Sequence, residues 1–123
     1  MKIISFAWTT PALIAGAKTV TRREWTASYA RTFYRQDFVR AYDRSPRAGG
    51  KQVGTIELTV CPYQEHVGLT HADEYRYEGL AWMEEHGLKM PSGLSPLEFW
   101  KEWQRQNPLV WVVRFKLVEI SSP

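Results

Sequence analysis

Side chains that can bind an anion or polarise a carbonyl group lie together near the start of the chain. The segment 16–23 has the sequence GAKTVTRR, with the amine of Lys18, the hydroxyl of Thr21 and the guanidinium groups of Arg22 and Arg23. A threonine hydroxyl stays protonated at neutral pH, so it acts as a nucleophile only beside a base or a cation. A partly desolvated Lys18 can supply that base. The same residue types are also common on an exposed edge strand, and alone the segment fits both interpretations.

Glu78 is the acidic candidate for the same site. It lies three residues after Tyr75 and four before Trp82, in a segment with helical apolar spacing, so it borders the expected buried face. A carboxylate there can reach inward, although helix geometry alone favours an exposed flanking charge. Glu74 lies further from the apolar face, and we expect it at the solvated surface.

Charge is divided unevenly along the chain, although the formal net charge is only +3. Residues 18–51 contain nine basic and three acidic side chains, and residues 65–102 contain eight acidic and three basic ones. Guanidinium groups bind phosphate bidentately, so the basic half suits RNA or a nucleotide. Alternatively, the two halves neutralise each other in the fold. The side chains expected to contact substrate or nucleic acid are Trp8, Arg22, Arg23, Tyr42, Arg44 and Arg47.

The elements that position these residues follow from apolar periodicity and helix caps. Strands are predicted at residues 2–8, 19–25, 38–43, 51–63 and 109–120. A short helix is expected from Thr10 to Gly16, and capping boxes at residues 70–73 and 95–98 predict two more, ending at Gly87 and before Asn107. Residues 26–36 fit a helical turn and an ordered loop equally.

About five strands with three to four helices inserted between them predict an α+β fold rather than a sandwich or a doubly wound sheet. A strongly curved mixed sheet or small β-barrel removes most free strand edges. The length of 123 residues suits one domain over residues 1–123.

Three motifs resemble the ASCH domain family, relatives of the PUA fold. Gly16, Lys18, Thr21 and Arg23 fit its opening signature, which is roughly Gly-x-Lys-x-x-Thr-x-Arg. Residues 39–51 resemble its central strand and following turn, and Glu78 with the next glycine resembles a Glu-Gly pair in a helix of the family. The resemblance spans nearly the whole chain and implies a PUA-like fold that binds RNA or a modified nucleoside in a basic cleft.

One single-domain branch of that family removes the acetyl group from N4-acetylcytidine with a lysine, a threonine and a glutamate. By resemblance, the Thr21 hydroxyl would attack the acetyl carbonyl and Lys18 would activate that hydroxyl. Glu78 would orient the base or manage the proton of the leaving amine. Arg23 and Arg22 would hold the substrate or stabilise negative charge. The basic insert at residues 25–37 departs from that branch and leaves the substrate open.

Two other functions remain open at this point. The same domain can be a non-catalytic RNA-binding module, in which Lys18 and the arginines contact phosphates while Trp8, Trp25 or Tyr42 stacks on a base. A weaker alternative is a protein-interaction domain that uses the acidic helices.

Composition argues against several other classes. No apolar run approaches the roughly 20 residues of a membrane span, so we expect no membrane partner. The three histidines lack the i, i+4 spacing of a helical zinc pair, and we expect neither a metal nor a cofactor. The opening segment is too short for a secretory signal and Cys61 is the single cysteine, which indicates a cytoplasmic protein.

Overall fold

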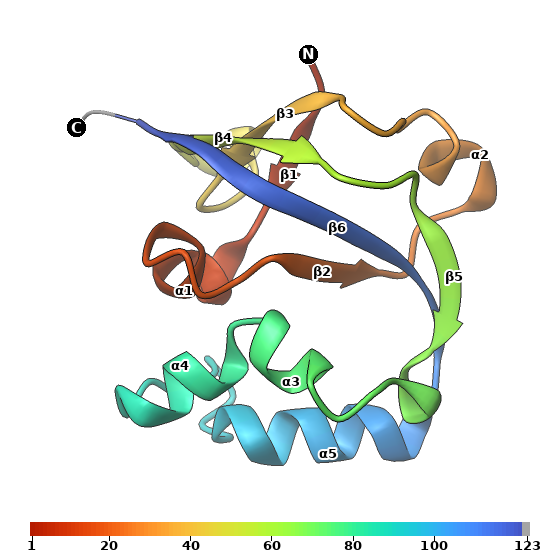
Figure 1. The fold of residues 1–123 in the computed structure, drawn as a ribbon. Coiled ribbons are helices and arrows are strands. Elements are labelled where there is room, and N and C mark those ends of the chain that lie inside the picture. Colours follow the sequence, from red (N-terminus) through yellow and green to blue (C-terminus); the bar gives the residue numbers. More distant parts are fainter. Residues whose placement is uncertain (122–123) are drawn as a thin grey trace.

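The computed structural model describes residues 1–121 as a curled six-stranded sheet with a layer of helices on one side (Figure 1). The strands are β1 (Ile3–Ser5), β2 (Val20–Arg23), β3 (Phe38–Tyr42), β4 (Gln52–Leu58), β5 (Tyr63–His66) and β6 (Leu109–Ile120). The helices are α1 (Thr10–Ile14), α2 (Ala27–Ala30), α3 (Glu74–Tyr77), α4 (Leu80–Glu85) and α5 (Pro96–Gln106), with 3-10 turns η1 (Ala7–Thr9), η2 (Pro46–Ala48) and η3 (Val67–Leu69). The predicted α+β class with a strongly curved mixed sheet, a small PUA-like fold, is confirmed.

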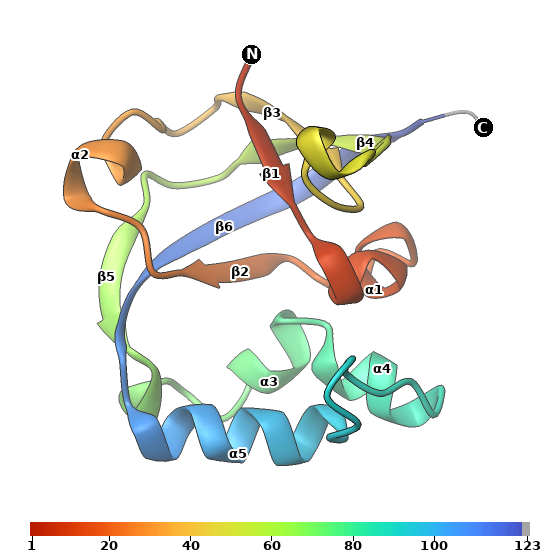
Figure 2. The same cartoon turned by 180° about the vertical axis from the view of Figure 1, so that it is seen from behind.

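Strand order explains where the sheet stays open. The path runs β1-β3-β4-β6-β2, and β5 also pairs with β6. Only β1 and β3 pair in parallel among the described strands. β1 and β2 end the path, and Figure 2 shows both on the near side, above the layer formed by α3, α4 and α5. The edges of β1 and β2 are therefore joined by side chains rather than by a strand ladder.

Apolar side chains form two clusters. The first fills the inside of the curled sheet and includes Ile4, Phe6, Ile56 and Phe115. The second lies between the sheet and the helix layer and is centred on Trp100. Burying large aliphatic and aromatic side chains in this way supplies most of the driving force for folding.

The five predicted strands are all present, with one difference. The strand expected over residues 51–63 ends at Leu58, and β5 begins at Tyr63 as a sixth strand. Both pair with β6 on the same side, so the expected strand is bent rather than absent. Between residues 26 and 36, only the single turn α2 is helical, capped by the Thr26 hydroxyl, which accepts from the backbone N–H of Tyr29.

One of the two predicted capping boxes is confirmed. Ser95 Oγ accepts from the Glu98 backbone N–H and the Glu98 carboxylate accepts from the Ser95 N–H, both at 3.1 Å. The box at Thr70 is wrong, because the Thr70 hydroxyl donates to the carbonyl of Val67 in η3 and α3 begins only at Glu74. No helix within residues 1–121 is both long enough and apolar enough to cross a membrane.

Candidate functional site

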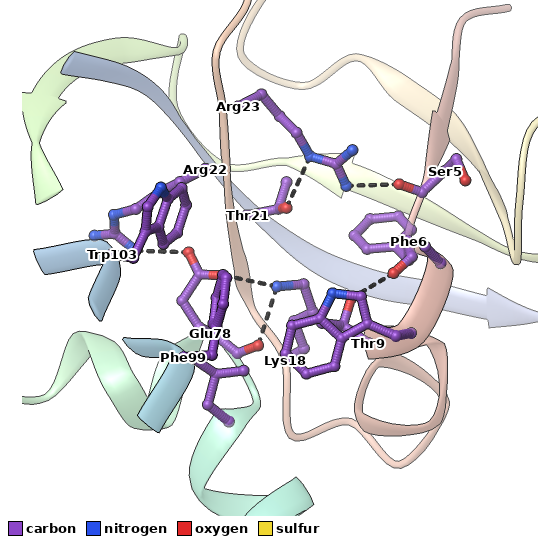
Figure 3. A pocket seen from close by; sticks show the side chains of 13 residues that line it. Ser5, Phe6, Thr9, Lys18, Thr21, Arg22, Arg23, Glu78, Phe99 and Trp103 are labelled. Carbon is purple, nitrogen blue, oxygen red and sulfur yellow. Dashed lines mark hydrogen bonds and ion pairs between the residues drawn. The ribbon is translucent and has the colours of Figure 1, made fainter. Parts of the chain in front are cut away.

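A pocket of about 230 Å³ lies where β1 and β2 fail to pair. Its lining comes from the end of β1 with η1, from β2 and Lys18 two residues before it, from the α3–α4 junction and from α5 (Figure 3). Lys18, Thr21 and Glu78 all line this pocket. The structure thus brings the three sequence-predicted residues to one place.

Lys18 is buried at the floor of the pocket, with 1% of its side chain exposed. Its Nζ donates to Glu78 Oε1 at 2.9 Å and to the Glu78 backbone carbonyl at 3.0 Å. Burial lowers the pKa of Lys18, because desolvation disfavours the ammonium more than Glu78 stabilises it. The neutral amine is therefore reached at lower pH than in an exposed lysine.

Glu78 reaches Lys18 because the helical segment is broken at Gly79. Residues 74–85 were expected in one continuous helix, but Gly79 has φ +85° and separates α3 from α4. Because of the break, the backbone of Glu78 forms an isolated β-bridge with Lys18 instead of continuing the helix. A Cβ at Gly79 would lie 2.7 Å from Ala12 Cβ and 2.9 Å from Lys18 Cβ, so both the φ angle and the close approach require glycine.

Thr21 is 4% exposed, and its Oγ1 accepts from Arg23 Nε at 3.1 Å. Arg23 also donates through Nη2 to the carbonyl of Ser5 at 2.6 Å, which joins β2 to β1. Strand alternation alone would place Lys18 and Thr21 on opposite faces. β2 ends the sheet, so side chains from both of its faces can line the same pocket. Between these two described residues there is no direct hydrogen bond.

Arg22 anchors Glu78 from the side opposite Lys18. Its side chain is 0% exposed, and Nη1 donates to Glu78 Oε2 at 2.8 Å. Nη2 donates to Glu74 and, at 3.1 Å, to Glu65. Burial alone would lower the pKa of Arg22, but these three carboxylates outweigh it and raise the pKa above its usual value. Arg22 therefore stays charged and holds Glu78 in place.

Glu74 is a site residue that sequence reasoning missed. It was expected at the solvated surface, but it is 5% exposed and accepts from Arg22 and, at 2.7 Å, from Arg114. Burial raises the pKa of Glu74, and the arginines outweigh that effect and lower it. Its place four residues before Glu78 was the available signal, because that spacing puts both carboxylates on one helix face.

The pocket carries less free positive charge than expected, because only Arg23 of its three basic residues is not in an ion pair with a described carboxylate. Lys18 and Arg22 are faced by carboxylates, which neutralise most of their charge. Of the six predicted binding residues, Trp8, Arg22 and Arg23 line the pocket. The other three do not, because Tyr42 lies on β3, and Arg44 and Arg47 are exposed on the turn that follows it.

One wall of the pocket is aromatic and consists of Trp8, Phe99 and Trp103. Phe99 packs edge-on against Trp8 at a ring-centroid distance of 5.4 Å and lies 5.5 Å from Trp103. Sequence reasoning did not assign Phe99 or Trp103 to the site, although their i, i+4 spacing places both on one face of α5. An aromatic wall opposite polar groups suits a planar ligand.

Within residues 1–121, no group of three or more histidine, cysteine, aspartate or glutamate side chains lies close enough to hold a metal ion. The carboxylates of Glu78 and Glu74 instead form ion pairs with Lys18, Arg22 and Arg114.

Comparison with known proteins shows the fold. No family model matches the chain, and no curated protein matches its sequence. The structure is similar to the crystal structure of protein EF3133 from Enterococcus faecalis V583, which carries the family designation DUF984. The TM-score is 0.62 at 16% sequence identity, over 99% of this chain and 82% of that one. The chain is therefore similar to EF3133 in its curled half-barrel sheet and flanking helices.

Proposed function

We propose that the protein is an amidohydrolase that removes the acyl group from N4-acylated cytidine. The observation that carries the proposal is the Lys18 amine, which is buried, has a lowered pKa and is held by Glu78 in the same pocket as the Thr21 hydroxyl. A buried lysine with this environment suits a general base better than a phosphate contact.

Acylation of Thr21 is the first half of the proposed reaction. Neutral Lys18 takes the hydroxyl proton as Thr21 Oγ1 attacks the acyl carbonyl carbon. Arg23, which already donates a hydrogen bond to Thr21, stabilises the negative charge that develops on the carbonyl oxygen. The tetrahedral intermediate then breaks its C–N bond, and the Lys18 ammonium returns the proton to the departing exocyclic amine of cytosine.

Deacylation repeats the same proton transfer with water. Lys18 takes a proton from a water molecule that attacks the threonyl ester, and then returns it to Thr21 Oγ1 as the carboxylic acid leaves. Glu78 forms and breaks no covalent bond in either half of the reaction. It orients Lys18 through two hydrogen bonds and stabilises the ammonium form while the proton resides there.

Pocket size and shape support a single base as the ligand. A volume of about 230 Å³ is below the roughly 300–1,000 Å³ of sites that enclose a drug-sized molecule. The aromatic wall of Trp8, Phe99 and Trp103 supplies a surface for the pyrimidine ring. The ribose of the ligand therefore remains near the pocket mouth, which admits both a free nucleoside and a nucleotide within RNA.

Acetate release from N4-acetylcytidine tests this function directly. Thr21→Ala and Lys18→Met should each reduce kcat/KM by about 10²–10⁴-fold. Thr21→Ser should retain part of the activity, because it keeps a hydroxyl. Thr19→Ala is the matched control, since Thr19 is exposed in the same segment, and it should behave as the unmodified protein. No acetate release, or equal rates for Thr21→Ala and Thr19→Ala, would exclude the reaction.

A non-catalytic RNA-binding module is the second candidate. It is favoured by the Thr21 hydroxyl, which is engaged by Arg23 and makes no hydrogen bond to Lys18 among the described contacts. In that case an N4-acetylcytidine-containing ligand would bind and be recovered unchanged. Isothermal titration followed by chromatographic recovery of the ligand separates the two candidates.

A further inference from the structure

The outward face of β3 carries one arginine between two aromatic residues. Val39 and Ala41 are fully buried, so Phe38, Arg40 and Tyr42 point to the other side of the strand. Phe38 is 50% exposed and Arg40 is also exposed. Alternate residues lie about 7 Å apart along a strand, so these three form a row on the outward face, in which Tyr42 is half-buried.

Free cations extend the row at both ends. Five further basic residues in the segments that flank β3 are exposed: Arg31, Arg35, Arg44, Arg47 and Lys51. Arg40 and these five residues form no ion pair with any described residue. Six cations that are not in ion pairs with described residues therefore lie on β3 and in its flanking segments.

The acidic residues within this segment do not cancel the charge through ion pairs. Asp37 accepts from the backbone N–H of Tyr34, and Asp43 accepts from that of Lys51, each at 2.8 Å. Both carboxylates are thus engaged by the backbone of turns. Neither is in an ion pair with a described arginine or lysine.

A polar hollow adjoins the Phe38 end of the row. It measures about 260 Å³ and is lined by residues that include Arg35, Glu57 and Lys116. Phe38 pairs in register with Glu57, which pairs in turn with Lys116 on β6. Lys116 Nζ lies 3.5 Å from Glu57 Oε1, so these two residues form an ion pair. Arg35 is the other cation of the hollow, and it forms no ion pair with a described carboxylate. Arg35 can therefore contact a phosphate group at this end of the row.

We propose that the outer face of β3 and the flanking basic segments bind single-stranded RNA, at a surface separate from the pocket. Arginines contact the phosphates, and Phe38 and Tyr42 stack on unpaired bases. A duplex would hide its bases from these rings, so the aromatic residues favour a single strand. The choice of RNA over DNA rests on the proposed function, whose substrate is a ribonucleoside.

The two surfaces are close enough to serve one RNA strand. Tyr42 pairs in register with Ser5, which lines the pocket, and the Phe6 backbone N–H donates to the Tyr42 carbonyl at 2.8 Å. Adjacent strands lie about 4.8 Å apart. RNA along β3 would therefore present a neighbouring nucleotide to the pocket.

Fluorescence anisotropy with an unacetylated single-stranded RNA over a range of salt concentrations tests the proposal. Log affinity should fall with log salt with a slope no steeper than about −4, since each phosphate contact by the six cations contributes about −0.7. Arg40→Gln/Arg44→Gln should weaken binding and make the slope shallower by about 1.4. Phe38→Ser should weaken binding about 5- to 150-fold and leave the slope unchanged.

Arg76→Gln/Arg105→Gln is the matched control. It changes the net charge equally, and both arginines are exposed on the helix layer, at the end of the molecule away from β3 (Figure 1). Retention of affinity by the control supports the β3 surface. Equal loss in both double variants, equal affinity for single-stranded DNA or duplex RNA, or no measurable binding would overturn the proposal. Acetate release from the free nucleoside is measured separately. If the unmodified protein hydrolyses the nucleoside but shows no measurable RNA binding, this surface is rejected and the proposed reaction is not.

Discussion

The protonation state of Lys18 decides which chemistry the pocket can perform. Desolvation by burial disfavours its ammonium form, Glu78 opposes that effect, and the nearby Arg23 and Arg22 add to the lowering of the Lys18 pKa. As an ammonium, Lys18 has no lone pair with which to accept the proton of Thr21. The proposed reaction therefore requires the neutral amine.

Hydrolysis should consequently increase with pH. The pKa of folded Lys18 lies below its ordinary value of 10.5, so kcat/KM should rise as the pH passes upward through that lowered pKa. Glu78→Gln removes the charge that opposes desolvation, and it should move the rise to lower pH as well as reduce the rate. Stopped assays of acetate release across a pH series measure both effects.

Lys18→Arg is the control for this pH dependence, because a guanidinium does not deprotonate in proteins. Its residual activity should be low and should lack the rise. A rise at the same pH in the unmodified protein and in Glu78→Gln would show that Lys18 is not the titrating base. Each variant is compared at a temperature where its cooperative unfolding transition has not begun.

At the scale of the elements, the break between α3 and α4 positions the site. Gly79 adopts φ +85° and packs against Ala12 and Lys18, so the chain turns where Glu78 meets Lys18, two residues before β2. An unbroken helix would leave the Glu78 carbonyl bonded within its own backbone. The helix break thus creates one of the two acceptors for Lys18 Nζ.

Gly79→Ala should damage both stability and activity. A left-handed φ costs a non-glycine residue about 1–2 kcal/mol, and here the new Cβ would also collide with neighbouring side chains at under 3.0 Å. Gly87→Ala is the matched control, since Gly87 has φ +67° but no atom within 4 Å of the added Cβ. Urea unfolding should show a smaller loss for Gly87→Ala, with its acetate release unchanged. Equal losses of stability and activity in the two variants would contradict this role for Gly79.

Capping motifs and apolar periodicity predicted structure that depends on neighbouring residues, but they did not predict contacts between distant segments. The Ser95 capping box predicted the start of α5 because both of its hydrogen bonds lie within four residues. The Thr70 hydroxyl was misassigned because its acceptor belongs to a preceding turn that was not predicted. Gly79 lies close to Lys18, sixty-one positions earlier, and the periodicity of the segment around Gly79 carried no sign of that contact.

At the scale of the whole molecule, the sequence predicted the curled α+β sheet but not how its edges meet. The meeting of Lys18, Thr21 and Glu78 was expected only from the resemblance to a family. The position of the pocket depends on strand order, which leaves β1 and β2 at opposite ends of the path. Strand order arises from pairings between distant segments, and apolar alternation does not specify those pairings.

Ion pairs join the helix layer to the sheet. Arg22 on β2 and Arg114 on β6 both donate to Glu74 on α3, and Arg22 also donates to Glu78. The apolar cluster around Trp100 fills the space beside them. Because the carboxylates face arginines that remain charged at all accessible pH values, the attachment depends on the ionised state of Glu74.

Acid should therefore weaken the folded molecule through Glu74. The folded-state pKa of Glu74 lies below its ordinary value of 4.5, so its stabilising effect is complete above that value and is lost as the pH falls through the lowered pKa. Glu74→Gln should cost about 1–3 kcal/mol at pH 7 and flatten the decline of unfolding free energy at low pH, measured by urea unfolding from pH 7 to 3. Glu102→Gln is the control, because Glu102 also contacts an arginine, Arg105, but its side chain on α5 is 42% exposed, against 7% for Glu74. If Glu102→Gln flattens the decline as much as Glu74→Gln does, the acid sensitivity belongs to surface charge in general and not to the attachment of α3 to the sheet.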